Sequence, residues 1–164
     1  YIRTSNRFKV LENQVKQALS GIEVAFTQRY DMLTKLLDVA NGFVGHENRI
    51  FAELIALRRG MQPEELAAAA QRMDDVQSKI SLTAENYPQL RSSDLFQQLQ
   101  RGVRDAEEHL SAARRLYNSS VTTYNSAIAV FPARIVASLE RRQEKPLFVA
   151  PEGRTQDVAM HIAQ

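Results

Sequence analysis

Arg29 is the residue whose type and position most invite a chemical interpretation, because it places a charge in an otherwise apolar helical stripe. Its neighbours three and four positions away are Ala25, Phe26, Met32 and Leu33. None of these is a carboxylate, so an ion-pair partner must come from another segment of the chain. A buried charge is costly unless it is paired. The position therefore suggests either a binding node or a structural role, in which the guanidinium extends to solvent or forms an ion pair that fixes helix register. The structural interpretation is the simpler one.

A polar stretch, YNSSVTTYNSA (117–127), repeats Tyr-Asn after seven residues. That interval is two helical turns, so Tyr117 and Tyr124 share one helix face, while Asn118 and Asn125 lie at its edge. Each ring is expected to be buried, and its hydroxyl then needs a partner. Each amide can bond backbone or side-chain groups of a facing segment. The repeat indicates packing and does not indicate catalysis.

The other residues that often carry chemistry do not form a recognisable site. His46, His109 and His161 fall in separate segments, and none has a glutamate three positions before it, as the Glu-x-x-His pattern of di-iron bundles requires. Glu107 and Glu108 are adjacent, so their side chains point about 100° apart on a helix and favour a solvated or ion-paired face. The sequence has no cysteine, no phosphate-binding glycine loop and no nucleophile elbow. It predicts no metal, no cofactor and no catalytic activity.

The composition fits one globular domain and excludes two classes of protein. The 164 residues include 21 basic and 19 acidic side chains, and this net charge of +2 does not indicate a nucleic-acid-binding protein. No apolar run approaches the roughly 20 residues that a membrane span needs. The chain begins at YIRTSNRF without an initiator methionine, so we expect that an upstream segment was removed.

Apolar residues at alternating three- and four-residue spacing predict two long helices, over residues 4–44 and 94–131. At 1.5 Å per residue each is about 55 to 60 Å long. The first stripe ends at Phe43. In the second stripe large residues alternate with mainly small ones, so a neighbouring helix can approach closely. Its members are Phe96, Leu99, Val103, Ala106, Leu110, Ala113, Tyr117, Ser120, Tyr124, Ala127 and Phe131.

Shorter elements complete the predicted fold. The patterns predict a short helix over 46–59, a further helix over 63–86 and a short amphipathic piece over 133–145, with prolines at the breaks. The segment that follows has no sustained period and is expected to be extended. We therefore divide the chain into a helical bundle domain, residues 1–140, and a C-terminal extended tail, residues 141–164.

The partner of Arg29 distinguishes two topologies for the long helices. If they are antiparallel, position 29 faces about position 110, and Glu107 lies one turn away. If they are parallel, position 29 faces Tyr117 instead. The residues alone leave both arrangements open, so the observed partner of Arg29 reports the topology.

Three stretches of the sequence together resemble the LemA family of bacterial proteins. They are FTQRYDMLTKLLDVANGFVGHE, LTAENYPQLRSSDLFQQLQ and AARRLYNSSVTTYNSAIAVFPARIVA, and their order and spacing match across about residues 1–140. Four short motifs that occur together are distinctive of the family: Arg29-Tyr30-Asp31, Tyr117-Asn118, Tyr124-Asn125 and Phe131-Pro132.

The resemblance implies an all-α fold, an antiparallel four-helix bundle with two long helices, one short helix and a C-terminal extension. It also implies an N-terminal transmembrane helix or lipoprotein anchor and no agreed molecular activity. One branch of the family is associated with magnetosome membranes and others with the cell envelope. This sequence departs from the family pattern at Thr34, where a proline is usual, so the first helix is expected to run straight. The aromatic-rich segment after Phe-Pro is reduced to SLERRQEKPLF, and a membrane-apposed role for it is correspondingly less expected.

Two functional hypotheses follow. The first is a membrane-anchored helical interaction or scaffold module with protein partners, membrane-associated through an anchor that this chain lacks, on a side of the membrane that the sequence leaves open. The second is a small-ligand sensor or enzyme with a pocket between helices near Arg29, Tyr30, Glu107 and Tyr117. Basic side chains in the last helical piece are candidates for contact with anionic lipid head groups; they are Arg134, Arg141, Arg142 and Lys145.

Overall fold

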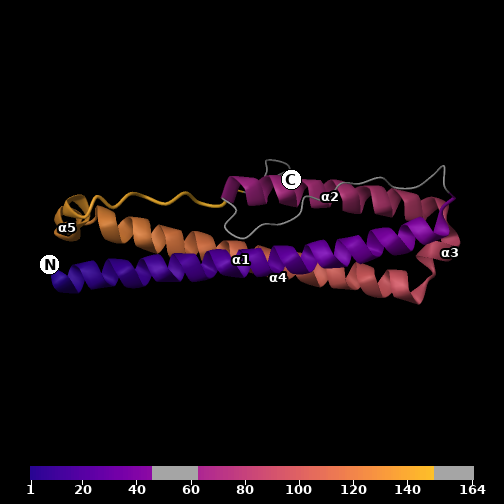
Figure 1. Cartoon of the computed structure of the whole chain (residues 1–164), viewed down its shortest axis with the longest axis horizontal. Helices are drawn as coiled ribbons and strands as arrows, with labels where there is room; N and C mark the ends of the chain where they lie inside the picture. The colour runs from indigo at the N-terminus through magenta and orange to yellow at the C-terminus, as the bar shows by residue number, and fades with distance from the viewer. Residues whose placement is uncertain (46–62, 150–164) are drawn as a thin grey trace, which may run out of the picture.

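The computed structural model describes residues 1–45 and 63–149, and in these ranges the chain is helical without a strand (Figure 1). The all-α fold class is confirmed. The helices are α1 (Ile2–Phe43), α2 (Pro63–Asn86), α3 (Pro88–Arg91), α4 (Asp94–Ala129) and α5 (Ala133–Leu139).

The predicted helix bounds lie within two residues of the observed ones for α1, α2 and α4. α1 is unbroken through Thr34, whose hydroxyl donates to the carbonyl of Tyr30 at 2.9 Å. α4 begins at a capping serine, since the Ser93 hydroxyl accepts a hydrogen bond from the backbone N–H of Phe96 at 3.5 Å. The predicted helix over 46–59 lies outside the described residues.

α1 and α4 lie side by side and run in opposite directions along the whole molecule (Figure 1). Their register is given by two facing pairs. Arg29 meets Glu107 at 2.7 Å, and a Cβ added to Gly102 would lie 3.0 Å from the sulfur of Met32. A higher residue number in α1 therefore faces a lower residue number in α4, so the two helices are antiparallel. The glycine allows the close approach of the two helices at that level.

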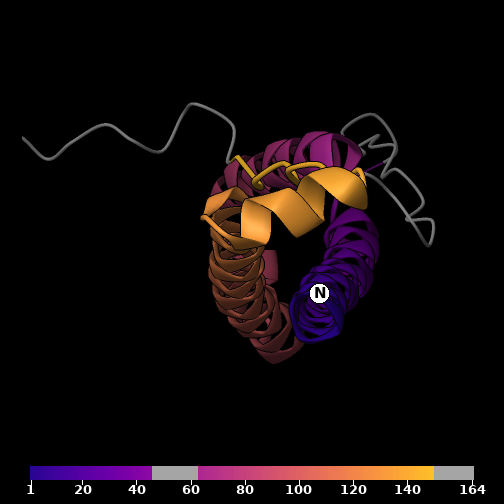
Figure 2. The same ribbon diagram turned by 90° about the vertical axis from the view of Figure 1, so that its left-hand side faces the viewer.

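Three further elements cover the α1–α4 pair (Figure 1): α2, α5 and the segment that follows α5. α2 runs in the same direction as α1 and covers the half of the pair that contains the C-terminal end of α1 (Figure 1). At the other end α5 crosses over the ends of α1 and α4 (Figure 2). Residues 142–149, the tail segment, have no regular secondary structure and run back along the pair toward the start of α2.

The predicted helical piece over 133–145 is too long, because α5 ends at Leu139. The N–H of Arg142 bonds the carbonyl of Ala137 at 3.0 Å and the N–H of Arg141 bonds that of Ser138 at 3.1 Å. This is a Schellman motif, and Arg141 takes the left-handed conformation at its C′ position with φ 51°. The chain therefore leaves the helix before the charged residues that follow. The division into domains at residue 140 stays a prediction.

The core follows the predicted stripes except at their ends and in the second half of α4. Phe43 is 45% exposed and Phe131 is 76% exposed, so their assignment to the buried stripes is wrong. In the second half of α4, Val121 and Ile128 are buried in place of the predicted Ser120 and Ala127. A straight helix repeats its face every 18 residues, whereas a strict seven-residue repeat drifts by about 20° per heptad. Five full turns relate Val103 to Val121 and Leu110 to Ile128, so these pairs share one face.

Candidate functional site

Arg29 links three helices in the middle of the molecule. Its side chain is 3% exposed, and Nη2 donates to Asp74 Oδ1 at 2.5 Å, Gln77 Oε1 at 3.0 Å and Glu107 Oε1 at 2.7 Å. The arginine comes from α1, Asp74 and Gln77 from α2, and Glu107 from α4. We call these four residues the arginine node. One charge thus fixes the register of α1 against both neighbouring helices.

The node carries one positive and two negative charges, and its carboxylates remain partly solvated. The side chain of Asp74 is 37% exposed and that of Glu107 is 25% exposed, so water shares the cost of the extra negative charge. Glu107 lies where the antiparallel arrangement places it. Sequence reasoning missed Asp74 and Gln77, although their three-residue spacing at the edge of an apolar helix face was a usable signal.

Among the residues that the structure describes, the cavity found beside the arginine node is small. It has a volume of about 120 Å³ and is lined by Leu36, Gln77, Ser81, Gln100, Val103 and Arg104. Pockets for small organic ligands are usually about 300 to 1,000 Å³. Tyr30 is half-buried against the core, and Asp31 is exposed. Among the candidates for the inter-helix pocket, the structure brings together Arg29 and Glu107.

The two asparagines of the Tyr-Asn repeat bind the backbone of the tail segment. Asn118 Nδ2 donates to the carbonyl of Phe148 at 3.0 Å, and its Oδ1 accepts from the N–H of Phe148 at 2.7 Å. Asn125 pairs in the same way with Lys145, at 2.9 Å in both directions. Each amide therefore satisfies both polar backbone groups of one residue, as a neighbouring β-strand does.

The spacing of the repeat matches the spacing of the bound residues. Seven helical residues rise about 10.5 Å, and three residues of extended chain span about 10 Å. The tail segment runs antiparallel to α4, so Asn118 meets Phe148 while Asn125 meets Lys145. The heptad interval is thus the interval at which one helix face can hold an extended chain at two points.

The tyrosines of the repeat complete this contact. Tyr117 is 3% exposed, and its hydroxyl donates to the carbonyl of Pro146 at 3.1 Å. Burial raises the pKa of Tyr117, and the negative charge of Glu64 adds to the rise. The ammonium group of Lys145 lies 5.3 Å from the ring centroid of Tyr124, within the range of a cation–π contact.

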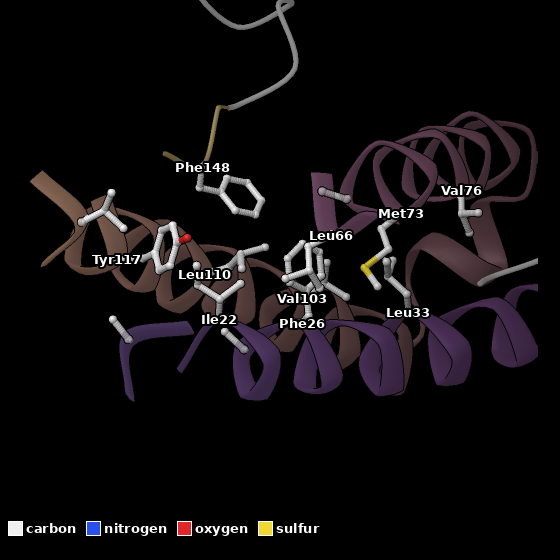
Figure 3. Packing of buried hydrophobic residues seen from close by; sticks show 14 of the residues in the cluster. Ile22, Phe26, Leu33, Leu66, Met73, Val76, Val103, Leu110, Tyr117 and Phe148 are labelled. Atoms are coloured by element: carbon white, nitrogen blue, oxygen red, sulfur yellow. The ribbon is translucent and has the colours of Figure 1, made fainter. Parts of the chain in front are cut away.

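Phe148 is the side chain that anchors the tail segment in the core. It is 4% exposed, and in Figure 3 its ring points toward the cluster that contains Leu110 and Tyr117. The guanidinium carbon of Arg114 lies 4.9 Å from the centroid of the Phe148 ring and 5.8 Å from that of Phe26. Arg114 therefore bridges the anchor to α1 through two aromatic rings. We call the surface formed by Glu12, Arg114, Tyr117, Asn118, Tyr124 and Asn125 the tail site.

Ion pairs tie the start of the tail segment to α1. Glu12 pairs with Arg142 at 3.3 Å and with Lys145 at 3.4 Å, and Arg142 also pairs with Glu140 at 2.6 Å. Burial alone would raise the pKa of Glu12, but the charges of Lys145, Lys16 and Arg142 outweigh it and lower that pKa. Two of the four basic residues predicted to meet lipid are therefore engaged within the protein.

The remaining chemical candidates are dispersed. His109 is exposed, and its Nδ1 lies 3.5 Å from Gln28 Oε1; His46 and His161 lie outside the described residues. Within residues 1–45 and 63–149, no group of three or more His, Cys, Asp or Glu side chains has a geometry that could hold a metal ion. In the same part of the chain no helix is both long and apolar enough to cross a bilayer.

Two comparisons with known proteins bear on this architecture. A sequence profile described as the LemA family matches residues 18–161, which is most of the chain. The sequence is also similar to Protein LemA of Metamycoplasma hominis, with 26% identity over 166 residues that cover 96% of this chain and 74% of that protein.

Proposed function

Because the chain belongs to the LemA family, we propose that it is a membrane-anchored helical interaction module of the bacterial cell envelope or of a specialised membrane compartment. An anchor that precedes Tyr1 would hold one end of the bundle at the membrane, and the rest would extend away from it and meet protein partners. We propose no catalytic activity for it.

The observation that carries this proposal is the surface of the bundle end at which α1 begins. The exposed side chains there are largely apolar, each between 55% and 76% exposed: Tyr1, Ile2, Val130, Phe131, Ile135 and Leu139. Four exposed arginines accompany them: Arg3, Arg7, Arg134 and Arg141. We call these ten residues the tip. Apolar and basic side chains together suit the interface of an anionic lipid surface.

The position of the tip fits an anchor at the N-terminus. α1 begins there, and α5 lies beside that end (Figures 1 and 2). The 42 residues of α1 give the bundle a length of about 63 Å, so its far end would project well beyond the lipid head groups. The alternative, a ligand sensor or enzyme at Arg29, gains no support from the small cavity beside that residue.

Vesicle co-sedimentation of the chain tests the proposal. We expect binding to phosphatidylglycerol vesicles and much weaker binding to phosphatidylcholine vesicles. The double variant Arg134→Gln/Arg141→Gln should bind the anionic vesicles about 30-fold more weakly, since each basic residue near such a surface contributes about 1 kcal/mol. The matched control, Arg72→Gln/Arg101→Gln, removes two exposed charges from the far half. Equal losses in both variants, or equal binding to both lipids, would contradict the proposed role of the tip.

A further inference from the structure

We propose that the tail site binds an extended peptide of a partner protein, and that the tail segment of the same chain occupies the site in place of that peptide. The peptide would carry a lysine and, three residues later, an aromatic residue. This inference rests on the interaction role proposed above, for which it names the class of partner, and it does not depend on membrane contact.

Most of the contacts in the tail site are hydrogen bonds to the backbone of the bound segment. Asn118 and Asn125 bond the N–H and C=O of Phe148 and Lys145, and Tyr117 bonds the carbonyl of Pro146. Any extended segment carries these groups at the same spacing. Recognition of this kind resembles the addition of a strand to a sheet edge, where main-chain bonds give affinity and a few pockets give specificity. The tail site is therefore built for extended chain, whichever molecule supplies it.

Two side chains of the tail segment define the specificity. Phe148 is buried, whereas Leu147 is 48% exposed and Val149 is 71% exposed. The lysine is held by Glu12 at 3.4 Å and by the face of the Tyr124 ring. Between them, Pro146 is bound through its backbone carbonyl and Leu147 is exposed, so the side chains at these two positions can vary.

Proline is tolerated between the two anchors for a physical reason. Proline has no N–H to donate, and at position 146 the backbone group that bonds the site is the carbonyl, which accepts from Tyr117. A Lys-Pro-x-Phe segment thus loses no hydrogen bond in the site. The fixed φ of proline also favours the extended conformation before binding.

The tail segment is placed so that it can leave without disrupting the helices. It follows the Schellman turn of α5 at Arg141, and Phe148 is the one buried side chain among residues 142–149. An open hollow of about 570 Å³ flanks its lysine end, lined in part by Glu12, Tyr124 and Lys145. Segments with few buried contacts open locally before the whole domain unfolds.

The tethered tail competes with any free peptide. A short tether gives an effective concentration in the millimolar range, so a free peptide gains access when the tail has been released. Replacing Phe148 by aspartate should release it, because the carboxylate loses the buried apolar area of the ring, and even beside Arg114 its desolvation costs more than an ion pair returns. The Phe148→Asp chain keeps the complete tail site on α1 and α4.

Fluorescence anisotropy with a labelled synthetic peptide of residues 143–149 tests the inference on the 164-residue chain and its variants. We expect the peptide to bind Phe148→Asp at least about tenfold more tightly than the wild type. Adding Asn118→Ala and Asn125→Ala should weaken binding about tenfold or more. The matched control adds Ser119→Ala and Thr122→Ala, two exposed polar neighbours on the same helix, and should bind like Phe148→Asp. A peptide with aspartate in place of its phenylalanine should not bind.

Circular dichroism and thermal melting establish that each variant is folded, and Phe148→Ser replaces Phe148→Asp if the latter does not fold. Equal binding to the asparagine variants and their control would overturn the inference, as would no binding to a folded released variant. Dimers of the wild type that disappear in Asn118→Ala/Asn125→Ala would also overturn it, because the occupant would then be the tail of a second copy. Vesicle binding of the Phe148→Asp chain tests the membrane role separately, so either proposal can fail alone.

Discussion

Two different kinds of element cover the two halves of the α1–α4 pair. A helix, α2, covers one half, and the extended tail segment covers the other. α2 contributes eight buried residues, and its own hydrogen bonds satisfy its backbone. The tail segment contributes the buried ring of Phe148, and residues 143–149 form no helix or strand whose hydrogen bonds would satisfy their backbone. Side chains of α4 bond the backbone groups of Lys145, Pro146 and Phe148 instead.

This difference explains why the character of α4 changes along its length. Opposite α2, its buried positions are apolar, as at Phe96, Val103 and Leu110. Opposite the tail segment, its buried face includes Tyr117 and Tyr124, with Asn118 and Asn125 alongside. An extended neighbour requires donors and acceptors at fixed intervals, whereas a helical neighbour requires apolar volume. A regular repeat of uncharged polar residues on an otherwise apolar helix therefore predicts an extended segment lying on it.

The largest expected effect is in the half covered by α2, from Arg29→Ala. The substitution leaves Asp74 and Glu107 without their shared cation and removes the link between three helices. We expect a loss of about 2 kcal/mol in the free energy of unfolding, below the range for fully buried pairs because both carboxylates reach solvent. Urea unfolding followed by circular dichroism measures this loss. The control Arg101→Ala, at an exposed position of α4, should change the free energy of unfolding by no more than about 0.5 kcal/mol. An equally small change for Arg29→Ala would show that the node does not stabilise the bundle.

A smaller and more local effect is expected from Asn118→Ala in the half covered by the tail segment. Two backbone hydrogen bonds to Phe148 are lost, at a net cost of about 1 kcal/mol to the docking of the tail segment. Hydrogen exchange should show faster exchange of the Phe148 amide, with α1 and α4 unchanged. Ser119→Ala serves as the matched control. Faster exchange throughout α1 would contradict the view that this half opens on its own.

The smallest effect is expected from acid, again at the tail segment. The pKa of Glu12 is lower in the folded chain than its ordinary value, because Lys145 and Arg142 outweigh the effect of burial. Its stabilising contribution is therefore complete above the unfolded pKa of about 4.3 and is lost as pH falls through the lowered folded pKa.

Glu12 is partly exposed, so we expect the contribution to be under about 1 kcal/mol. At pH values below about 4.3, the approximate unfolded pKa, the urea concentration at the unfolding midpoint should decrease more steeply with falling pH for the wild type than for Glu12→Gln. Parallel curves for the two proteins would show that the ion pairs at Glu12 add nothing to stability.

The long helices and one contact of the arginine node were predictable because periodicity encodes them. Side-chain spacing defines which face of a helix is buried, and matching the two stripes in the antiparallel direction, which the family resemblance implies, places Glu107 within one turn of the position that faces Arg29. The contribution of α2 was not predictable in the same way. Periodicity indicates which face of a short helix is buried, but not how far along a longer pair it lies, so Asp74 and Gln77 were missed.

The tail site could not be predicted because the tail segment that occupies it has no hydrophobic periodicity in its sequence. The tail segment is bound mainly through backbone groups, which every residue carries, so its sequence holds little sign of where it docks. The tyrosine and asparagine repeat marked the receiving face without identifying what lies on it. The error at Phe131 has another cause: the seven-residue repeat was followed past the end of the helix, because α4 ends at Ala129 and Phe131 lies exposed in the turn before α5.

The switch from helical to extended cover also changes how much chain the fold needs. α1 has 42 residues and α2 has 24, so α2 falls short of the full length by about 27 Å. Closing that gap with more helix would take about 18 residues, whereas the tail segment spans it with about eight, at roughly 3.3 Å each. A longer version of this bundle could therefore grow by adding one heptad to each long helix and three residues to the tail, a ratio that other chains of this architecture should obey if they are built the same way.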